Sequence, residues 1–143
     1  MANPVAGRLS DRRGRRPVTA LFLLAAASLA VAFYTVPAFG LGLLWALMMF
    51  ATMGADVTLA AYGAELFPTS YRSTASGARA FVSTLGTVGG LASVSLLFPL
   101  VGSNWNAIAL LGGLALLAPA LVWLVFPETS GRTLEEIAPE PDR

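Results

Sequence analysis

Two long segments without a charged residue limit what this chain can fold into. They run from Pro17 to Ala55 and from Ala80 to Pro127. A helix needs about 20 apolar residues to cross the roughly 30 Å hydrocarbon core of a bilayer, so each segment is long enough for two crossings. Turn-forming residues lie inside both segments, in "TVPAFG" and in "PLVGSNWN". The pattern predicts four membrane-spanning helices.

The composition indicates that lipid is the solvent for most of the chain. Hydrophobic residues make up 56% of the 143 residues, and charged residues only 12%. Soluble domains usually contain about 25% charged residues, and a chain of this length cannot bury so much apolar surface in one core. We therefore expect an all-α membrane protein. Its predicted parts are an N-terminal segment 1–17, spans at about 18–36, 40–63, 75–99 and 105–126, and a tail 127–143.

The basic residues are expected on one side of this four-span arrangement. All nine are arginines, and they lie in the N-terminal segment, in the loop after the second span and in the C-terminal tail. The other two loops contain none. Because positively charged loops stay in the cytoplasm, we expect a multi-pass protein of the plasma membrane with both termini cytoplasmic. The abundance of arginine and alanine favours a bacterial inner membrane.

The arginine-rich segment "GRLSDRRGRRP" admits other interpretations. An export signal of the twin-arginine type would precede a soluble domain, whereas three more apolar spans follow here. A nucleic-acid-binding arm is not expected, because the net charge is only +1 and the arginines would lie at the membrane face. A generic cytoplasmic anchor explains the arginines, but it does not explain Gly7, Asp11 and Gly14 among them.

Two residue types that carry much enzyme and metal chemistry are absent from the sequence. It contains no cysteine and no histidine, which excludes disulfides, thiolate metal sites and the usual general base. We therefore predict that the chain is not an enzyme and has neither a metal site nor a cofactor.

Three motifs resemble those of one transporter family. The segment "GRLSDRRGRRP" is similar to the G-x-L-x-D-R-x-G-R-R/K loop of the major facilitator superfamily, which joins helices 2 and 3 and again helices 8 and 9. "PETSGRTLEEI" differs only at Ser130 from a run that follows helix 12 in the sugar porter branch. "YGAELFPTSYR" resembles the end of helix 10 in the wider sugar-porter and organic-ion group. Their order implies helices 9–12, a partial C-terminal half of a twelve-helix major facilitator fold.

The resemblance also implies a conformational latch, in which charged residues tie helix ends together when the transporter faces outward and separate when it faces inward. Its members here would be Gly7, Asp11, Arg12, Gly14, Arg15, Arg16, Glu65, Arg72, Glu128 and Arg132. Asp11 would lie at the N-terminus of a neighbouring helix, where an anion is stabilised. Partly exposed ion pairs contribute only about 0–1 kcal/mol each. An ordinary interfacial pair and a solvated tail remain alternatives for these residues.

One ionisable residue lies within a predicted span. A carboxylate at the position of Asp56 is costly in a bilayer, about 2.5–3.5 kcal/mol near a helix centre, so it should face a polar cavity or a partner. It is a candidate for substrate binding or proton coupling. The alternative is a residue near the cytoplasmic end that reaches water.

The resemblance implies secondary active transport of a small solute by alternating access. Sugar porters carry G-P-x-x-W before the glutamate of helix 10, whereas "DVTLA" stands here without the proline or the tryptophan. An organic ion or metabolite is therefore favoured over a hexose, with proton coupling as an option. The expected partners are the lipid bilayer, the small-molecule substrate and helices 1–8 of the same transporter. A self-contained four-span homodimeric efflux protein, a helper subunit and a truncated gene product remain alternatives.

Overall fold

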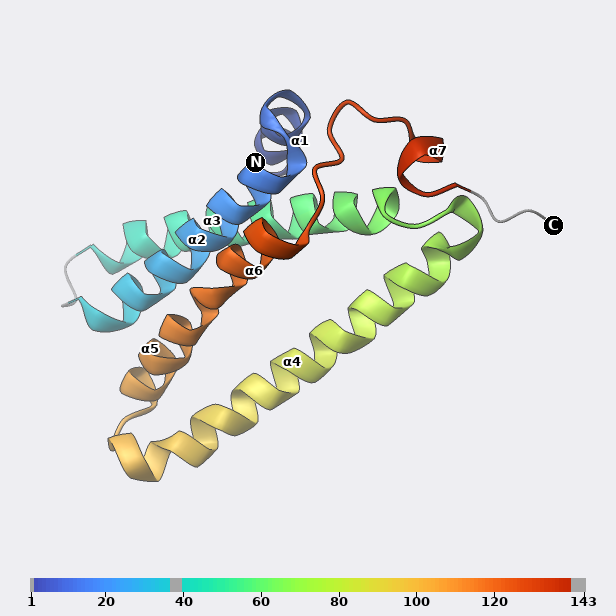
Figure 1. The fold of residues 1–143 in the computed structure, drawn as a ribbon. Helices are drawn as coiled ribbons and strands as arrows, with labels where there is room; N and C mark the ends of the chain where they lie inside the picture. The colour runs from blue at the N-terminus through green and yellow to red at the C-terminus, as the bar shows by residue number, and fades with distance from the viewer. Residues whose placement is uncertain (1, 37–39, 140–143) are drawn as a thin grey trace.

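The computed structural model describes residues 2–36 and 40–139, and helices form most of this part of the chain (Figure 1). The elements are α1 Ala2–Arg13, α2 Arg15–Thr35, α3 Leu41–Glu65, a 3-10 turn η1 Thr69–Tyr71, α4 Arg72–Val101, α5 Asn104–Ala115, α6 Leu117–Val125 and α7 Leu134–Ile137. Four segments are long and apolar enough to cross a membrane, namely α2, α3, η1 with α4, and α5 with α6. The prediction of an all-α chain with four spans is confirmed. The turn expected at Pro37 lies outside the described residues.

Most of the N-terminal segment is helical, and only Gly14 within it interrupts the helices. Helix α1 occupies Ala2–Arg13, although residues 1–17 are expected to form a motif loop. Pro4 lies in the first turn of α1, where proline is tolerated because no intrahelical bond needs its missing N–H. No further proline occurs before the next helix, and the break between α1 and α2 is confined to Gly14.

The third span ends later than its proline suggests. Helix α4 continues through Pro99 to Val101, and it ends at Gly102, which has a φ of +74°. The N–H of Gly102 donates to the carbonyl of Phe98 at 2.8 Å. This left-handed glycine is a common way for a helix to end. In the last turn Pro99 removes one donor without ending the helix.

The fourth span is interrupted once. Helix α5 ends at Ala115 and α6 begins at Leu117. Pro119 has no N–H to donate to the carbonyl of Ala115, which lies four residues earlier. The chain tightens at this point, because the N–H of Leu116 donates to the carbonyl of Gly113 at 3.2 Å. The two helices still form one continuous apolar segment.

Helix α2 is the centre of the packed part. It contacts α1, α3, α5 and α6, and α1 also packs on α3. The small core contains Ala6, Val18, Phe22 and Ala55. Gly54 lets α2 and α3 approach closely, because a Cβ at this position would lie 2.4 Å from the ring of Phe22.

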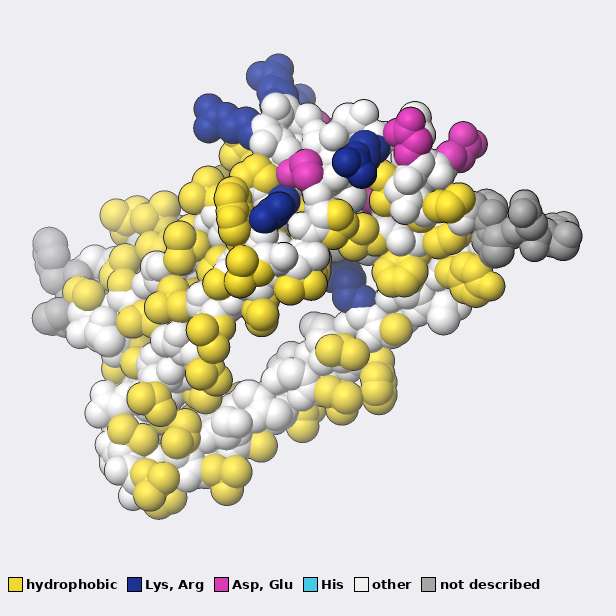
Figure 2. All heavy atoms as spheres, in the orientation of Figure 1, with side chains coloured by type: hydrophobic (Ala, Val, Ile, Leu, Met, Phe, Trp, Pro, Cys, Tyr) yellow, Lys and Arg dark blue, Asp and Glu magenta, His cyan; other side chains and the backbone are white. Residues whose placement is uncertain are grey.

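Most apolar side chains of the spans face outward. In the apolar 18-residue stretch of each span, at most 22% of the residues are buried. In the stretch within α4 none is buried. Helix α4 contacts α5 at one end and α3 at the other, and otherwise it diverges from the packed helices (Figure 1). Acidic and basic side chains gather at the opposite end from the α4–α5 turn (Figure 2). This distribution suits a chain surrounded by lipid along its length and by water at its charged end.

Candidate functional site

The site begins at the sharp turn between α1 and α2. Gly14 has φ +100° and ψ 146°, a conformation almost restricted to glycine. A Cβ on Gly14 would lie 2.7 Å from Oε2 of Glu128. Both the backbone conformation and the approach of a distant carboxylate therefore require glycine here.

Glu128 caps the N-terminus of α2. Its Oε1 accepts from the N–H of Arg15 at 2.8 Å, and its Oε2 accepts from the N–H of Arg16 at 3.2 Å. The N–H of Gly14 donates to the carbonyl of Ser10 at 3.1 Å, and Pro17 has no N–H. The first four positions of a helix leave donors without intrahelical partners, and here all are accounted for. A carboxylate also suits the positive end of the helix dipole.

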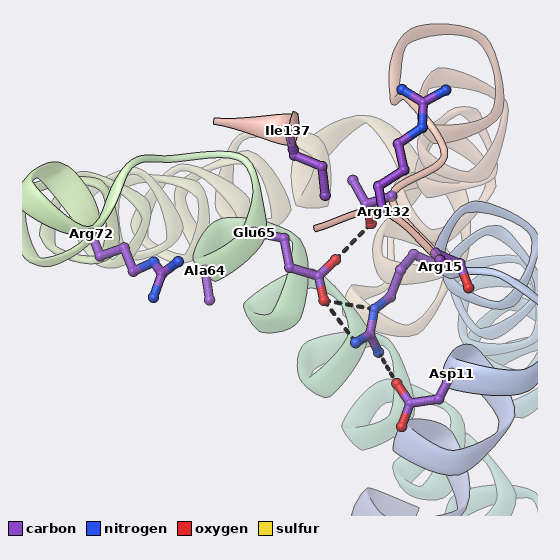
Figure 3. A pocket seen from close by; sticks show the side chains of 10 residues that line it. Asp11, Arg15, Ala64, Glu65, Arg72, Arg132 and Ile137 are labelled. Carbon is purple, nitrogen blue, oxygen red and sulfur yellow. Dashed lines mark hydrogen bonds and ion pairs between the residues drawn. The ribbon is translucent and has the colours of Figure 1, made fainter. Parts of the chain in front are cut away.

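Arg15 joins α2 to the end of α3 and to α1. Its Nη2 lies 2.7 Å from Oε1 of Glu65, and its Nε donates to the same oxygen at 2.9 Å. Its Nη1 lies 2.7 Å from Oδ1 of Asp11 and also donates to the hydroxyl of Ser10. Figure 3 shows the guanidinium of Arg15 between the carboxylates of Glu65 and Asp11. Three helix ends therefore meet at one guanidinium.

The Arg15–Glu65 pair is more buried than the sequence suggests. Both side chains are 18% exposed, whereas the side chain of Asp11 is 61% exposed. Removing one partner costs about 3–5 kcal/mol in a fully buried pair and about 0–1 kcal/mol in an exposed pair, and the partly buried Arg15–Glu65 pair lies between these limits. The estimate of about 0–1 kcal/mol for an exposed ion pair therefore applies to the Arg15–Asp11 pair only.

Each residue of this partly buried pair lies at the helix end where the helix dipole disfavours its charge. Arg15 is the first residue of α2 and Glu65 is the last residue of α3. Cations are destabilised near helix N-termini and anions near C-termini. The two side chains compensate each other across the helix ends, so each depends on the other remaining close.

The tail after α6 is held by three consecutive residues. The carbonyl of Pro127 accepts from the hydroxyl of Tyr62 at 3.2 Å. Glu128 caps α2 as described, and the hydroxyl of buried Thr129 donates to Oε2 of Glu65 at 2.6 Å. Tyr62 also packs edge-on against Phe126, with ring centroids 5.1 Å apart. We call Asp11, Arg15, Glu65, Glu128 and Thr129 the helix-end network.

Sequence reasoning missed several of these contributions. It did not identify Ser10, Tyr62 or Thr129, although all three lie inside the quoted motifs. The expected place of Asp11 at the N-terminus of a neighbouring helix stays a prediction, because that helix would belong to the other half of the transporter. Among the described residues Asp11 pairs with Arg15, and Glu128 caps α2.

The remaining residues expected in the latch lie around the network in different ways. The guanidinium carbon of Arg16 lies 4.9 Å from the ring centroid of Trp123, at a cation–π distance. Arg72 and Arg132 line a 420 Å³ pocket beside Glu65, but within the described ranges neither forms an ion pair. Arg12 is exposed. Gly7 contributes its carbonyl, which accepts from the hydroxyl of Ser10 at 3.1 Å.

Asp56 lies apart from the network. It is exposed within α3 and lines a separate groove between α3 and α4. It has no ion pair in the part of the chain that the structure describes. No group of three or more histidine, cysteine or acidic residues that could hold a metal ion occurs there either.

These features define a class of protein, a multi-pass α-helical membrane protein whose helix ends are joined by charges at one face. Residues 1–141 match the family model described as Major Facilitator Superfamily. The chain belongs to this superfamily. A stretch of 93 residues is 32% identical to a protein of Arabidopsis thaliana named "Probable inorganic phosphate transporter 1-6". This stretch covers 65% of the chain but only 18% of that protein.

Proposed function

We propose that the chain is the helix 9–12 portion of a secondary transporter that moves a small solute by alternating access. The observation that carries the proposal is the Arg15–Glu65 pair, capped on both sides by residues from α1 and from the tail. It joins segments that are 50 or more residues apart in sequence. Such a junction at one face can hold that face closed, which is what the outward-facing state of a transporter requires.

The network suits a switch because its two central charges need partners in either state. Separation of α2 from α3 would leave Arg15 and Glu65 at the unfavourable ends of their helices. Arg72 and Arg132 line the pocket beside Glu65, and they supply cations that can replace Arg15 when the face opens. Asp11 remains available to Arg15, because both lie on the continuous α1–α2 segment.

The charged end would face the cytoplasm, with both termini inside. The distribution of the arginines supports this orientation, in the plasma membrane of a bacterium. Cysteines introduced at Ser70 and Ser103 test it, because an impermeant thiol reagent added outside intact cells should label only the second. Labelling of only the first would reverse the orientation.

The substrate class that the motifs favour is an organic ion or metabolite, with proton coupling as an option. Asp56 is the candidate for substrate binding or coupling, because it is an unpaired carboxylate within a span. Inorganic phosphate is a second candidate, and the observation that favours it is the similarity to the plant protein named as a phosphate transporter. Uptake of labelled phosphate and of labelled organic ions by the same vesicles separates the two.

The experiment that tests the function is transport by the chain with and without the missing helices. Four helices supply only part of the wall around a central site. Residues 1–143 alone should insert in the membrane without catalysing uptake, and co-expression with a segment that supplies helices 1–8 should restore uptake. Saturable transport by the purified chain alone in liposomes would favour a self-contained four-span homodimer instead.

A further inference from the structure

A wide groove lies between α3 and α4. Its volume is about 850 Å³, and its walls include Asp56, Leu59 and Gly63 on α3 and Arg79 and Val82 on α4. Binding sites for small molecules usually measure about 300–1,000 Å³, with mostly apolar walls and a few polar groups. Figure 2 shows the hollow between α4 and the packed helices. The groove therefore has the size and the lining of a solute site.

Two opposite charges line its walls at different depths. Asp56 precedes Glu65, the last residue of α3, by nine residues, which is about 13 Å along the helix. The side chain of Arg79 lies beside Gly63, only two residues before Glu65. Asp56 is therefore the deeper of the two charges. Within the described ranges neither has an ion-pair partner.

The two charges are held apart along α3. The side chain of Arg79 passes over Gly63, where its Cδ lies 3.9 Å from the position that a Cβ would take. Gly63 and Asp56 are two turns apart on nearly the same face of α3, about 10 Å along its axis. No nitrogen of Arg79 lies within 4.0 Å of a carboxylate oxygen of Asp56, the limit for an ion pair. Space for a ligand remains between them.

An unpaired charge inside a membrane protein marks a pathway or a ligand site. A simple anion in this groove would compensate Arg79 and leave Asp56 alone, and a simple cation would do the reverse. A ligand with one charge of each sign compensates both. Its ammonium group would lie at Asp56 and its carboxylate at Arg79, with the apolar part of the molecule against Leu59 and Val82.

We infer that the α3–α4 groove binds a zwitterionic organic solute that bridges Asp56 and Arg79. The inference rests on the proposed transport function and names the substrate class for it. It depends on residues of this chain alone, because α3 and α4 form both walls. It can therefore fail while transport by the superfamily fold stands.

The test is equilibrium dialysis with the chain co-expressed with a segment that supplies helices 1–8, in phosphatidylcholine nanodiscs. The probes are 4-aminobutyrate, butyrate, butylamine and inorganic phosphate. We expect 4-aminobutyrate to bind at least tenfold more tightly than the other three. Glycine and 6-aminohexanoate, which have a shorter and a longer separation of their charges, report the spacing of the two sites.

Variants then assign the two ends of the ligand. Asp56→Asn should bind butyrate as tightly as 4-aminobutyrate, and Arg79→Gln should do so for butylamine. Exchange of the charges, Asp56→Arg with Arg79→Asp, should restore the preference for the zwitterion. Arg13→Gln and Glu135→Gln, which each remove one exposed charge outside the groove, serve as matched controls and should bind like the wild type.

Several results would overturn the inference. Equal binding of the four probes by the wild type would do so, as would tightest binding of phosphate. The same loss of all probes in both single variants, with helical content unchanged by circular dichroism, would show that the charges only maintain the fold. Uptake of an organic ion by the complete transporter together with equal probe binding would reject the groove as the site and leave the transport function intact.

Discussion

Helix α3 carries two acidic residues whose surroundings differ completely. Glu65 at its end accepts from Arg15 and from Thr129 and is 18% exposed. Asp56, about 13 Å deeper, has no partner among the described residues and lines an open groove. The same chemical group is thus saturated where helices join and unsatisfied where a cavity opens. The difference is the basis for our proposal that charge at the helix ends maintains a conformation and that charge in the groove binds a ligand.

The largest effect on stability and uptake should follow from removing the ion pair that satisfies Glu65. In the complete transporter, Arg15→Ala should lower the free energy of unfolding by about 1–3 kcal/mol, because partly buried Glu65 keeps only the hydrogen bond from Thr129. Uptake should fall at least tenfold while the protein still inserts. Thermal unfolding in detergent and initial rates of uptake measure the two effects.

A matched control and a second variant keep that prediction specific. Arg13→Gln removes an exposed arginine that is only two residues away and is not a member of the expected latch, and it should change neither quantity. Asp11→Asn should reduce uptake with little loss of stability, because the side chain is 61% exposed. If Arg15→Ala and Asp11→Asn both transported normally, the arginines would serve only to orient the chain in the membrane.

The next effect concerns the turn that brings the network together. Gly14→Ala should destabilise the protein by about 1–3 kcal/mol, because φ of +100° strains any other residue and the added Cβ would meet Glu128. Gly7→Ala is the matched control, since nothing lies within 4 Å of the corresponding Cβ. The measurement is the melting temperature of the two variants, which should be lower for Gly14→Ala. Equal melting temperatures would contradict the role assigned to the turn.

A smaller effect is expected at the cap of α2. Glu128→Ala should cost about 1 kcal/mol, because two backbone donors at the start of α2 lose their acceptor. Glu128→Gln should recover part of this loss, since an amide oxygen still accepts one bond. Melting temperatures in the order wild type, glutamine, alanine would support the cap. An alanine variant as stable as the wild type would show that lipid headgroups or water replace the carboxylate.

The smallest effect on thermal stability should follow from changing the two unpaired charges in the groove. Asp56→Asn and Arg79→Gln should leave thermal stability almost unchanged, because neither residue has an ion pair to lose. The same variants should nevertheless change which probe binds in the groove. Strong destabilisation by either variant would show that the two residues belong to the structure in the same way as Arg15 and Glu65.

The sequence predicted the parts of the fold that lipid dictates. A bilayer needs about 20 apolar residues for each crossing, and the uncharged segments therefore marked all four spans. Their ends were less accurate, because proline was read as a stop. Pro99 lies inside α4, and Gly102 ends that helix. Helix α1 was missed because a motif described as a loop was extended over residues that contain no strong helix breaker until Gly14.

The sequence identified several residues of the candidate site but not which of them contact one another. The motifs brought Arg15, Glu65 and Glu128 to attention, but their pairing depends on how helix ends meet in space. Glu128 follows Arg15 by 113 residues, and no local periodicity links them. The resemblance did not indicate that Glu128 would cap α2. Arg79 was treated only as a topology signal, since its position over Gly63 follows from the angle between α3 and α4.

The cap on α2 also imposes an order in time. Arg15 is among the first residues of this segment to leave the ribosome, whereas Glu128 follows 113 residues later. At about 5–20 residues per second, the start of α2 remains without its acceptor for roughly 6–23 seconds. During that interval the backbone donors of Arg15 and Arg16 must bond to water or to lipid phosphates. Completion of the junction is therefore a late event in biogenesis, and a ribosome that stops before Pro127 leaves the newly inserted helices unlocked.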